Sequence, residues 1–305
     1  MRRNVRFSGL SKLPNGNTSN KIVDGCIVLE GGAFRGIYTN GVLDALMQFE
    51  INMRCTVGTS AGALNGLNYV AGQIGRSARI NLGYRHDSRY VGLEAVKKNN
   101  GIIGFDFLLK GTQYFDPLNI PRFMNPNRDF IAVCTNCLTG KPEYFSKNKT
   151  EDIFKAVQAS ASMPYVSKMV QIEDGLYLDG GCSDKIAYQW AMDHGFKKII
   201  VVRTRQRDFR KSETSPLVKR MTHHIYGQYA AFERKLETMN EDYNRQCDEL
   251  VELEKQGRIF TIAPSLPVHV GRVESDMEKL GDLYYMGYLD GLNQIQKVKD
   301  YLEIA

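Results

Sequence analysis

The stretch RCTVGTSAGALNGLNYVAG, residues 54–72, places one serine in a glycine-rich turn between two different hydrophobic patterns. The turn follows a short apolar run typical of a buried strand, and the Ala- and Gly-rich residues after it continue as a helix. The G-x-S-x-G pattern at this junction is typical of a nucleophile elbow, a sharp strand-to-helix turn that exposes a serine hydroxyl. The N-terminus of the helix stabilises negative charge beside that hydroxyl. We therefore interpret Ser60 as a nucleophile, flanked by the elbow glycines Gly58 and Gly62.

An earlier segment repeats the same order of strand, glycine turn and helix. The run CIVLEGG, residues 26–32, is typical of a buried strand stopped by glycine. In FRGIYTNGVLDALMQFE, residues 34–50, the apolar residues recur at spacings that place them on one helical face. Two strand–turn–helix units in succession are typical of a parallel sheet with crossover helices. We therefore predict an α/β fold.

The rest of the chain continues with strands and helices. Residues 79–127 are irregular and aromatic-rich, so we expect an insertion or a cap over the sheet. Beyond them the patterns predict a strand pair, a helix ended by Pro164, a hairpin in MVQIEDGLYLDGG (169–181), a helix and a buried strand in KKIIVVRT (197–204). Residues 215–305 predict a helical region with one strand, RIFTIAPS. We expect residues 1–21 to be a flexible lead-in and residues 22–305 to form a single domain.

Composition excludes several classes of protein. The formal net charge of +6 over 305 residues is too low for a dense nucleic-acid-binding surface. No segment has the pattern of a signal peptide or the length of a membrane span, so we expect a soluble, cytoplasmic protein, with peripheral contact at a membrane surface left open. Cys134 and Cys137 form a lone C-x-x-C without a second pair at zinc-ligand spacing, and we expect no metal site.

The glycine-rich turn after the first strand, GGAFRG, is the candidate oxyanion hole. Acyl transfer needs hydrogen-bond donors aimed at an oxygen that becomes negative, and backbone N–H groups in such a turn supply them. The glycine spacing does not match a dinucleotide-binding G-x-G-x-x-G, and no Gly-Lys-Ser/Thr follows to make a P-loop. The residues of this candidate hole are Gly31, Gly32, Ala33, Phe34, Arg35 and Gly36.

A serine hydroxyl needs a base to become a good nucleophile. The chain has five histidines, and none lies in a glycine-rich turn or in an evident strand-end loop. Asp179, in the sequence LDGG at the end of a predicted strand, is the better candidate, because a desolvated carboxylate within hydrogen-bond reach can act as a base. Its alternative reading is ordinary turn chemistry, since Asp-Gly is common in hairpins.

Taken in order, GGAFRG, GTSAG, ASASMP and DGG resemble the patatin-like phospholipase family. The resemblance spans residues 22–202, and the charged helical part with IFTIAPS after it is similar to a bacterial branch of that family. It implies a three-layer α/β/α sandwich with a mostly parallel sheet, and a Ser60–Asp179 dyad with GGAFRG as the oxyanion hole. The family usually has glycine where this chain has Ala33. Alanine preserves the N–H donor only if the backbone there does not need a positive φ, and otherwise we expect low activity.

These observations predict a serine acyl hydrolase that cleaves carboxylic esters of lipids, phospholipids or lysophospholipids, without a cofactor. Two alternatives stay open: a soluble carboxylesterase with a Ser-His-Asp triad, and a non-catalytic lipid-binding module on the same fold. A basic loop, RTRQRDFRK (203–211), is either solvated or holds anionic head groups. The segment GFDFLLKGTQYF (104–115) either packs a core or docks acyl chains.

Overall fold

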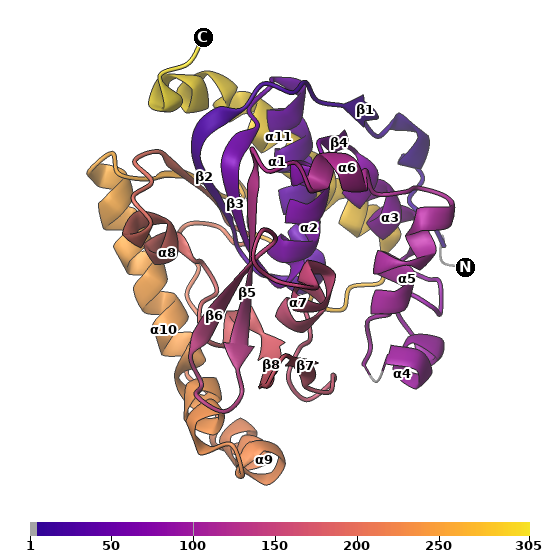
Figure 1. Cartoon of the computed structure of the whole chain (residues 1–305), viewed down its shortest axis with the longest axis vertical. Coiled ribbons are helices and arrows are strands. Elements are labelled where there is room, and N and C mark those ends of the chain that lie inside the picture. Colours follow the sequence, from indigo (N-terminus) through magenta and orange to yellow (C-terminus); the bar gives the residue numbers. More distant parts are fainter. Residues whose placement is uncertain (1–4, 100) are drawn as a thin grey trace.

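The computed structural model describes residues 5–99 and 101–305. Its centre is a sheet of eight strands in the order β10-β9-β2-β3-β5-β8-β7, with β6 paired to β5 off this path. The first five strands of this order are parallel to their neighbours, whereas β8, β7 and β6 join by antiparallel pairing. Figure 1 shows the helices on both sides of this sheet. The predicted α/β/α sandwich with a mostly parallel sheet is therefore confirmed.

The elements match most of the sequence predictions, including the hairpin of β7 and β8. The strands are β1 (Gly16–Asn17), β2 (Val23–Leu29), β3 (Met53–Thr59), β4 (Gln73–Ile74), β5 (Asp129–Asn136), β6 (Pro142–Ser146), β7 (Val170–Ile172), β8 (Gly175–Asp179), β9 (Ile199–Val202) and β10 (Phe260–Ile262). The α-helices are α1 (Ile37–Gln48), α2 (Ala61–Val70), α3 (Arg76–Tyr84), α4 (Leu93–Asn99), α5 (Phe105–Leu109), α6 (Ile120–Phe123), α7 (Ile153–Ser160), α8 (Tyr188–Asp193), α9 (Pro216–Tyr226), α10 (Ala230–Lys255) and α11 (Met277–Leu302). Short 3-10 helices are η1 (Leu10–Lys12), η2 (Ala33–Gly36), η3 (Gly111–Tyr114) and η4 (Gly180–Cys182).

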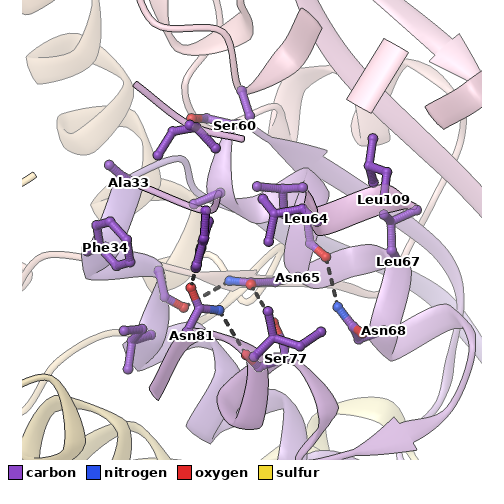
Figure 2. A pocket seen from close by; sticks show the side chains of 18 of the residues that line it. Ala33, Phe34, Ser60, Leu64, Asn65, Leu67, Asn68, Ser77, Asn81 and Leu109 are labelled. Carbon is purple, nitrogen blue, oxygen red and sulfur yellow. Dashed lines mark hydrogen bonds between the residues drawn. The ribbon is translucent and has the colours of Figure 1, made fainter. Parts of the chain in front are cut away.

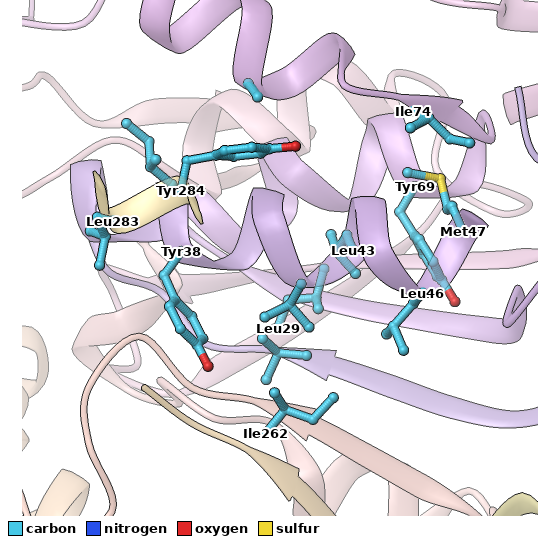
Figure 3. Close-up of a cluster of buried hydrophobic side chains, with 14 of the residues drawn as sticks. Leu29, Tyr38, Leu43, Leu46, Met47, Tyr69, Ile74, Ile262, Leu283 and Tyr284 are labelled. Atoms are coloured by element: carbon cyan, nitrogen blue, oxygen red, sulfur yellow. The ribbon is translucent and has the colours of Figure 1, made fainter. Parts of the chain in front are cut away.

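Successive side chains of the central strands pack against opposite helical layers. In β2, Ile27 and Leu29 face a cluster built with α1 and α11, while Cys26 and Val28 face one built with α8 and α10. Figure 3 shows part of the first cluster, with Leu29 near aromatic side chains of α1 and α11. A strand buried on both faces lacks the polar alternation of a half-exposed strand, which is why these runs read as continuously apolar.

The two ends of the chain both contribute to this core. Residues 215–305 place α10 on one face of the sheet, α11 on the other and β10 at its edge, so the single-domain organisation stays a plausible prediction of the sequence. The lead-in differs from expectation: Phe7 and Leu13 belong to the core, and the Phe7 ring lies against Gly281 of α11. Apolar side chains buried this way hold the described residues 5–21 in place. Residues 1–4 of the expected lead-in lie outside the described residues.

The irregular segment between β4 and β5 forms the short helices α4, α5 and α6, which lie on the same side of the sheet as α3 (Figure 1). All six cysteines are free and buried. In the described ranges, no group of three His, Cys, Asp or Glu side chains is arranged to hold a metal ion. No helix within these ranges combines the length and the hydropathy needed to cross a bilayer.

Asp44 of α1 gives a first prediction, on the pH dependence of stability. Its buried carboxylate accepts hydrogen bonds from Gly75 N–H and Tyr284 O–H, yet burial raises its pKa to about 7. A carboxyl whose pKa is raised on folding contributes stability that is present below pH 3.8 and is lost as the pH rises through about 7. The loss is on the order of 4 kcal/mol. Asp44→Asn keeps an acceptor for the Gly75 N–H and should remove this pH-dependent loss of stability.

The measurement is urea unfolding of wild type and Asp44→Asn from pH 4 to pH 8. The difference in the free energy of unfolding between the two proteins should grow in favour of the variant across this window. Other carboxylates act equally in both proteins and cancel in that difference. Two parallel stability curves would show that Asp44 does not titrate in the folded protein near pH 7.

Candidate active site

Ser60 occupies the single residue between β3 and α2, and its backbone is strained. Its φ of 58° and ψ of −123° lie in a region that non-glycine residues rarely adopt. The close packing of the turn explains the glycines: a Cβ at Gly62 would lie 2.3 Å from the Leu29 carbonyl oxygen. The Ser60 N–H donates to Ser160 Oγ at 2.9 Å, so a side chain from α7 also holds the turn. The strained strand-to-helix turn predicted around Ser60 is present, and its role as a nucleophile elbow stays a prediction.

The Ser60 hydroxyl donates a hydrogen bond to Asp179 Oδ2 at 2.6 Å. The topology explains this meeting: β8 runs antiparallel to β5 and its last residue, Asp179, pairs with Cys134, beside the end of β3. Gly181 N–H donates to the other carboxylate oxygen at 2.8 Å and fixes its orientation. The structure thus brings together the two residues that the sequence marked as nucleophile and base.

The environment of Asp179 favours proton uptake. Burial raises the pKa of its carboxyl, and the hydrogen bonds from Ser60 and Gly181 and the charges of Lys185 and Arg272 offset that rise in part. The side chain is only 7% exposed. A carboxylate with a raised pKa is a stronger base than one in water, which suits it to accept a proton from a serine.

The glycine-rich loop lies beside the elbow. A Cβ at Gly31 would lie 3.0 Å from both Ser60 Cβ and the Thr59 carbonyl oxygen, so a larger residue would require these neighbours to shift. Phe34 N–H donates to the Arg272 carbonyl oxygen at 3.4 Å. Among the described residues, the amides of Gly32 and Ala33 have no hydrogen-bond partner. These two N–H groups are therefore the free donors of the predicted oxyanion loop, a narrower set than the whole GGAFRG stretch.

We expected alanine at position 33 to preserve activity only if the backbone there does not need a positive φ. Ala33 has a φ of +51°, so this condition is not met. A left-handed conformation disfavours alanine by about 1 kcal/mol relative to glycine. Arg35, on the same loop, is buried, and its Nε has no partner within the described part of the chain. Burial and the neighbouring Arg205 lower the pKa of its guanidinium to about 10, so it stays charged at neutral pH.

Ala33→Gly is therefore expected to raise the free energy of unfolding by about 0.5 kcal/mol, because relief of the positive φ outweighs the greater freedom of glycine in the unfolded chain. Hydrolysis should be at least as fast as in wild type, since the N–H donor remains. Thermal unfolding and ester hydrolysis measure the two effects. Ala71→Gly is the matched control: Ala71 has a φ of −68°, so the same change there should lower stability. A destabilised Ala33→Gly variant would contradict the strain argument.

Two cavities meet at Ser60. The first, the apolar cavity, opens between η2, α2 and the short helices of the cap (Figure 2). A polar network closes its floor: Ser77 Oγ donates to Asn65 Oδ1, and Asn65 Nδ2 donates to the Gly36 carbonyl of the loop. Its apolar walls include Leu64, Leu67, Ile80, Ile103, Leu108 and Leu109. In the aromatic segment 104–115, Phe105 and Phe107 pack in the interior, and Leu108 and Leu109 line the cavity. Docking of acyl chains by this segment stays a prediction.

The second cavity, the basic cavity, lies on the other side of Ser60 and has a volume of about 340 Å³. Its lining contains Asp179 together with three cationic side chains, Arg35, Lys185 and Arg272. Sequence reasoning missed Lys185 and Arg272, because neither belongs to a recognisable motif. Lys185 lies six residues after Asp179 in a segment that reads as a helix, and Arg272 comes from a loop of the C-terminal region.

The basic loop 203–211 is for the most part neither solvated nor open to a ligand. Arg203 is fully buried, and Arg207 and Arg210 form ion pairs with Glu254 and Asp248 of α10. The charges of Arg205 and Lys211 act instead on the side chains around the basic cavity.

The described structure places no histidine in the lining of either cavity. His86 contacts the Ser275 carbonyl, His194 stacks on Trp190, and His223 pairs with Glu233 on the surface. A histidine that is not in contact with the serine or its surroundings cannot orient or deprotonate it. The geometry therefore favours the dyad over a Ser-His-Asp triad.

Comparisons with known proteins found two family models, a relative and a solved structure that are similar to this chain. The model of the patatin-like phospholipase family matches residues 27–189, and a model described as a domain of unknown function, DUF6363, matches residues 229–303. The chain is 27% identical over 285 residues to the uncharacterized protein YjjU of Escherichia coli K12, covering 87% of this chain and 75% of that protein. A solved structure, VipD from Legionella pneumophila, aligns with a TM-score of 0.47 and 14% identity, over 99% of this chain and 71% of the other.

Proposed function

The chain belongs to the patatin-like phospholipase family, and on that premise we propose that it is a serine acyl hydrolase that cleaves carboxylic esters of phospholipids or lysophospholipids. The observation that carries the proposal is the 2.6 Å hydrogen bond from Ser60 Oγ to Asp179 Oδ2, in a strained turn beside two free backbone N–H groups. A nucleophile, a base and donors for an oxyanion are the groups that acyl transfer requires.

In the proposed reaction, the acyl chain lies in the apolar cavity and the ester carbonyl lies above Ser60. Ser60 Oγ attacks the carbonyl carbon as Asp179 accepts its proton. The N–H groups of Gly32 and Ala33 donate to the oxygen that becomes negative, and the positive charge of Arg35 stabilises it further. The ester C–O bond then breaks, and the departing alcohol takes the proton from Asp179.

Water completes the cycle. It attacks the acyl-enzyme while Asp179 accepts a proton from it, and the carboxylic acid and free Ser60 are released. The raised pKa of Asp179 suits both transfers, because the carboxyl must take a proton and give it up again within each half of the cycle.

A fluorophosphonate probe tests this function directly, because it bonds covalently only to an activated serine. We expect labelling of wild type and none of Ser60→Ala, together with hydrolysis of p-nitrophenyl esters by wild type alone. His194→Ala and His269→Ala should retain full activity, which a triad would not allow. A folded wild-type protein that is neither labelled nor active would favour the lipid-binding module, an alternative that the strained Ala33 supports.

We further propose that α9 contacts the membrane from which the lipid is taken. Leu217, Met221 and Ile225, spaced by four residues on one helical face, are 76%, 42% and 42% exposed. Exposed basic residues, Lys219 and Arg220, lie on the same helix. An amphipathic helix of this kind binds at the interface of an anionic bilayer.

The position of α9 connects this apolar stripe to the active site. Tyr165, which lines the basic cavity, makes a 2.7 Å hydrogen bond with Thr222 of α9. Figure 1 shows α9 at one end of the molecule, next to the β7–β8 hairpin. A bilayer in contact with the stripe would therefore lie against a helix that contacts the basic cavity.

The double variant Leu217→Glu/Met221→Glu should weaken binding to anionic vesicles about tenfold or more. It removes apolar side chains that would be buried in the bilayer and adds negative charges that anionic lipids repel. Vesicle sedimentation measures the binding. The matched control is Leu289→Glu, which changes a leucine of similar type (55% exposed) on α11 and should bind as wild type does. Equal loss in both proteins would contradict a role specific to α9.

A further inference from the structure

The basic cavity holds cations that the protein itself leaves unpaired. In the described residues, the side chains of Arg35, Lys185 and Arg272 line the cavity and form no ion pair and no hydrogen bond, although fourteen ion pairs occur elsewhere. The Lys211 side chain, outside the lining, has no such partner either. The Nζ atoms of Lys185 and Lys211 lie 5.3 Å and 4.3 Å from the centre of the Tyr243 ring. Both lysine side chains therefore contact the same aromatic ring.

The carboxylates nearby do not balance this charge. Glu30 is fully buried; one of its oxygens accepts from Thr204 N–H and the other has no partner in the described chain. Asp179 is already bonded to Ser60 and Gly181. Burial, Lys185 and Arg272 lower the pKa of Lys211 to about 6, and burial lowers that of Lys185 to about 8. Unpaired cations crowded in this way are disfavoured without an anion.

We propose that the basic cavity binds the phosphate and head group of the alcohol portion of the ester. Its cations repel the ammonium of a zwitterionic head group, so the preferred substrates are phospholipids with anionic head groups. The inference rests on the proposed function, because it places the phosphate relative to the ester that Ser60 attacks. Phosphate oxygens accept charge-assisted hydrogen bonds from arginine and lysine, which gives Lys185 and Arg272 the partners that the folded chain does not supply.

The arrangement of the two cavities supports this assignment. Both contain Ser60, Ala33 and Arg272, so a single ester can reach from one into the other. The apolar cavity takes the acyl chain, which leaves the basic cavity for the departing alcohol. Its volume of about 340 Å³ lies in the range of small-ligand sites. When the ester C–O bond breaks, the alcohol oxygen receives the proton held by Asp179, and its phosphate stays bound by Lys185 and Arg272 until release.

The test compares the hydrolysis of vesicles of phosphatidylglycerol with that of vesicles of phosphatidylcholine, using the full chain. We expect wild type to prefer phosphatidylglycerol at least tenfold in kcat/KM. Lys185→Met and Arg272→Gln should each reduce that ratio about tenfold through KM. The matched control, Lys297→Met, removes an exposed lysine from α11 that lies outside the lining of the basic cavity and should keep the ratio. A wild-type ratio near one, or equal effects of all three variants, would overturn the proposal.

Two further arms separate the possible failures. Glycerol 3-phosphate, a soluble phosphate ester, should inhibit hydrolysis of p-nitrophenyl butyrate by wild type and do so more weakly with Lys185→Met. Inhibition by inorganic phosphate alone, with no preference among lipids, would assign the cavity to free phosphate and refute the head-group proposal. Absence of any hydrolysis of p-nitrophenyl butyrate would contradict the proposed function instead. Lys185→Met should also raise Tm, because burial lowers the pKa of Lys185 to about 8 and so disfavours its charged form in the folded protein. A variant that loses Tm is thereby recognised as misfolded.

Discussion

Asp179→Asn is expected to reduce kcat about 10³-fold while raising the Tm of the protein. The amide retains the shape of the carboxylate and an acceptor for Gly181 N–H, but it cannot take a proton from Ser60. The stability gain follows from burial: because burial raises the pKa of Asp179, its ionised form is disfavoured in the folded state at neutral pH, and neutral asparagine avoids that penalty. Opposite effects on activity and stability are typical of catalytic groups.

Asp184→Asn is the matched control for this prediction. Asp184 is as buried as Asp179, and burial raises its pKa as well, but its carboxylate accepts from Tyr144 O–H and Gln246 Nε2 rather than from Ser60. The control should therefore keep its rate of p-nitrophenyl ester hydrolysis. Stopped-flow or steady-state kinetics and differential scanning calorimetry measure the two quantities. A tenfold or smaller loss in Asp179→Asn, or an equal loss in Asp184→Asn, would show that Asp179 is not the base.

The residues that the sequence identified are those whose role is imposed locally. Gly58, Ser60 and Gly62 lie within one turn, and the close approach of Leu29 makes the glycines necessary. Asp179 was recognisable because an Asp-Gly-Gly at a strand end leaves room beside a carboxylate. In each case a few adjacent residues contain the steric reason for the pattern.

The residues that sequence reasoning missed come together only through tertiary packing. Lys185, Lys211 and Arg272 are far apart in the chain, and each follows an ordinary pattern of helix, loop or surface charge. Their common feature is the lack of a partner, which a single sequence cannot show. The basic loop 203–211 illustrates the same limit, because its composition suggested a single basic surface. In the structure, Arg207 and Arg210 form ion pairs with α10, whereas the Nζ atom of Lys211 is buried.

The backbone conformation of Ala33 was also beyond the sequence. GGAFRG indicates a tight turn, but which of its residues has a positive φ depends on how the loop packs on Thr204 and Ser60. Of the first three residues of the turn, Gly31, Gly32 and Ala33, the one with a positive φ is the alanine. A chain that keeps such strain at a functional loop has a specific, testable weakness there.

The second large effect is expected at the crossing of α1 and α11, where the C-terminal region holds the oxyanion loop. A Cβ at Gly287 would lie 2.0 Å from the Tyr38 carbonyl oxygen, and one at Gly41 would lie 2.1 Å from the Tyr284 carbonyl oxygen. The helix backbones therefore touch, with no flexible side chain that can move aside. Gly287→Ala should lower the free energy of unfolding by about 3 kcal/mol, as overpacking of a rigid core does.

Gly83→Ala is the matched control, since Gly83 lies inside α3 and a Cβ there meets only Leu10, at 3.6 Å. The same substitution should stabilise the protein by about 0.5 kcal/mol, because alanine favours a helix more than glycine does. Urea unfolding gives both values.

The substitution at Gly287 should also affect the active site, because α1 begins directly after η2 and Arg272 precedes α11. Displacement of α11 should therefore also reduce ester hydrolysis in Gly287→Ala, and a destabilised variant with wild-type kinetics at low temperature would show that the loop is held independently of the C-terminal helix.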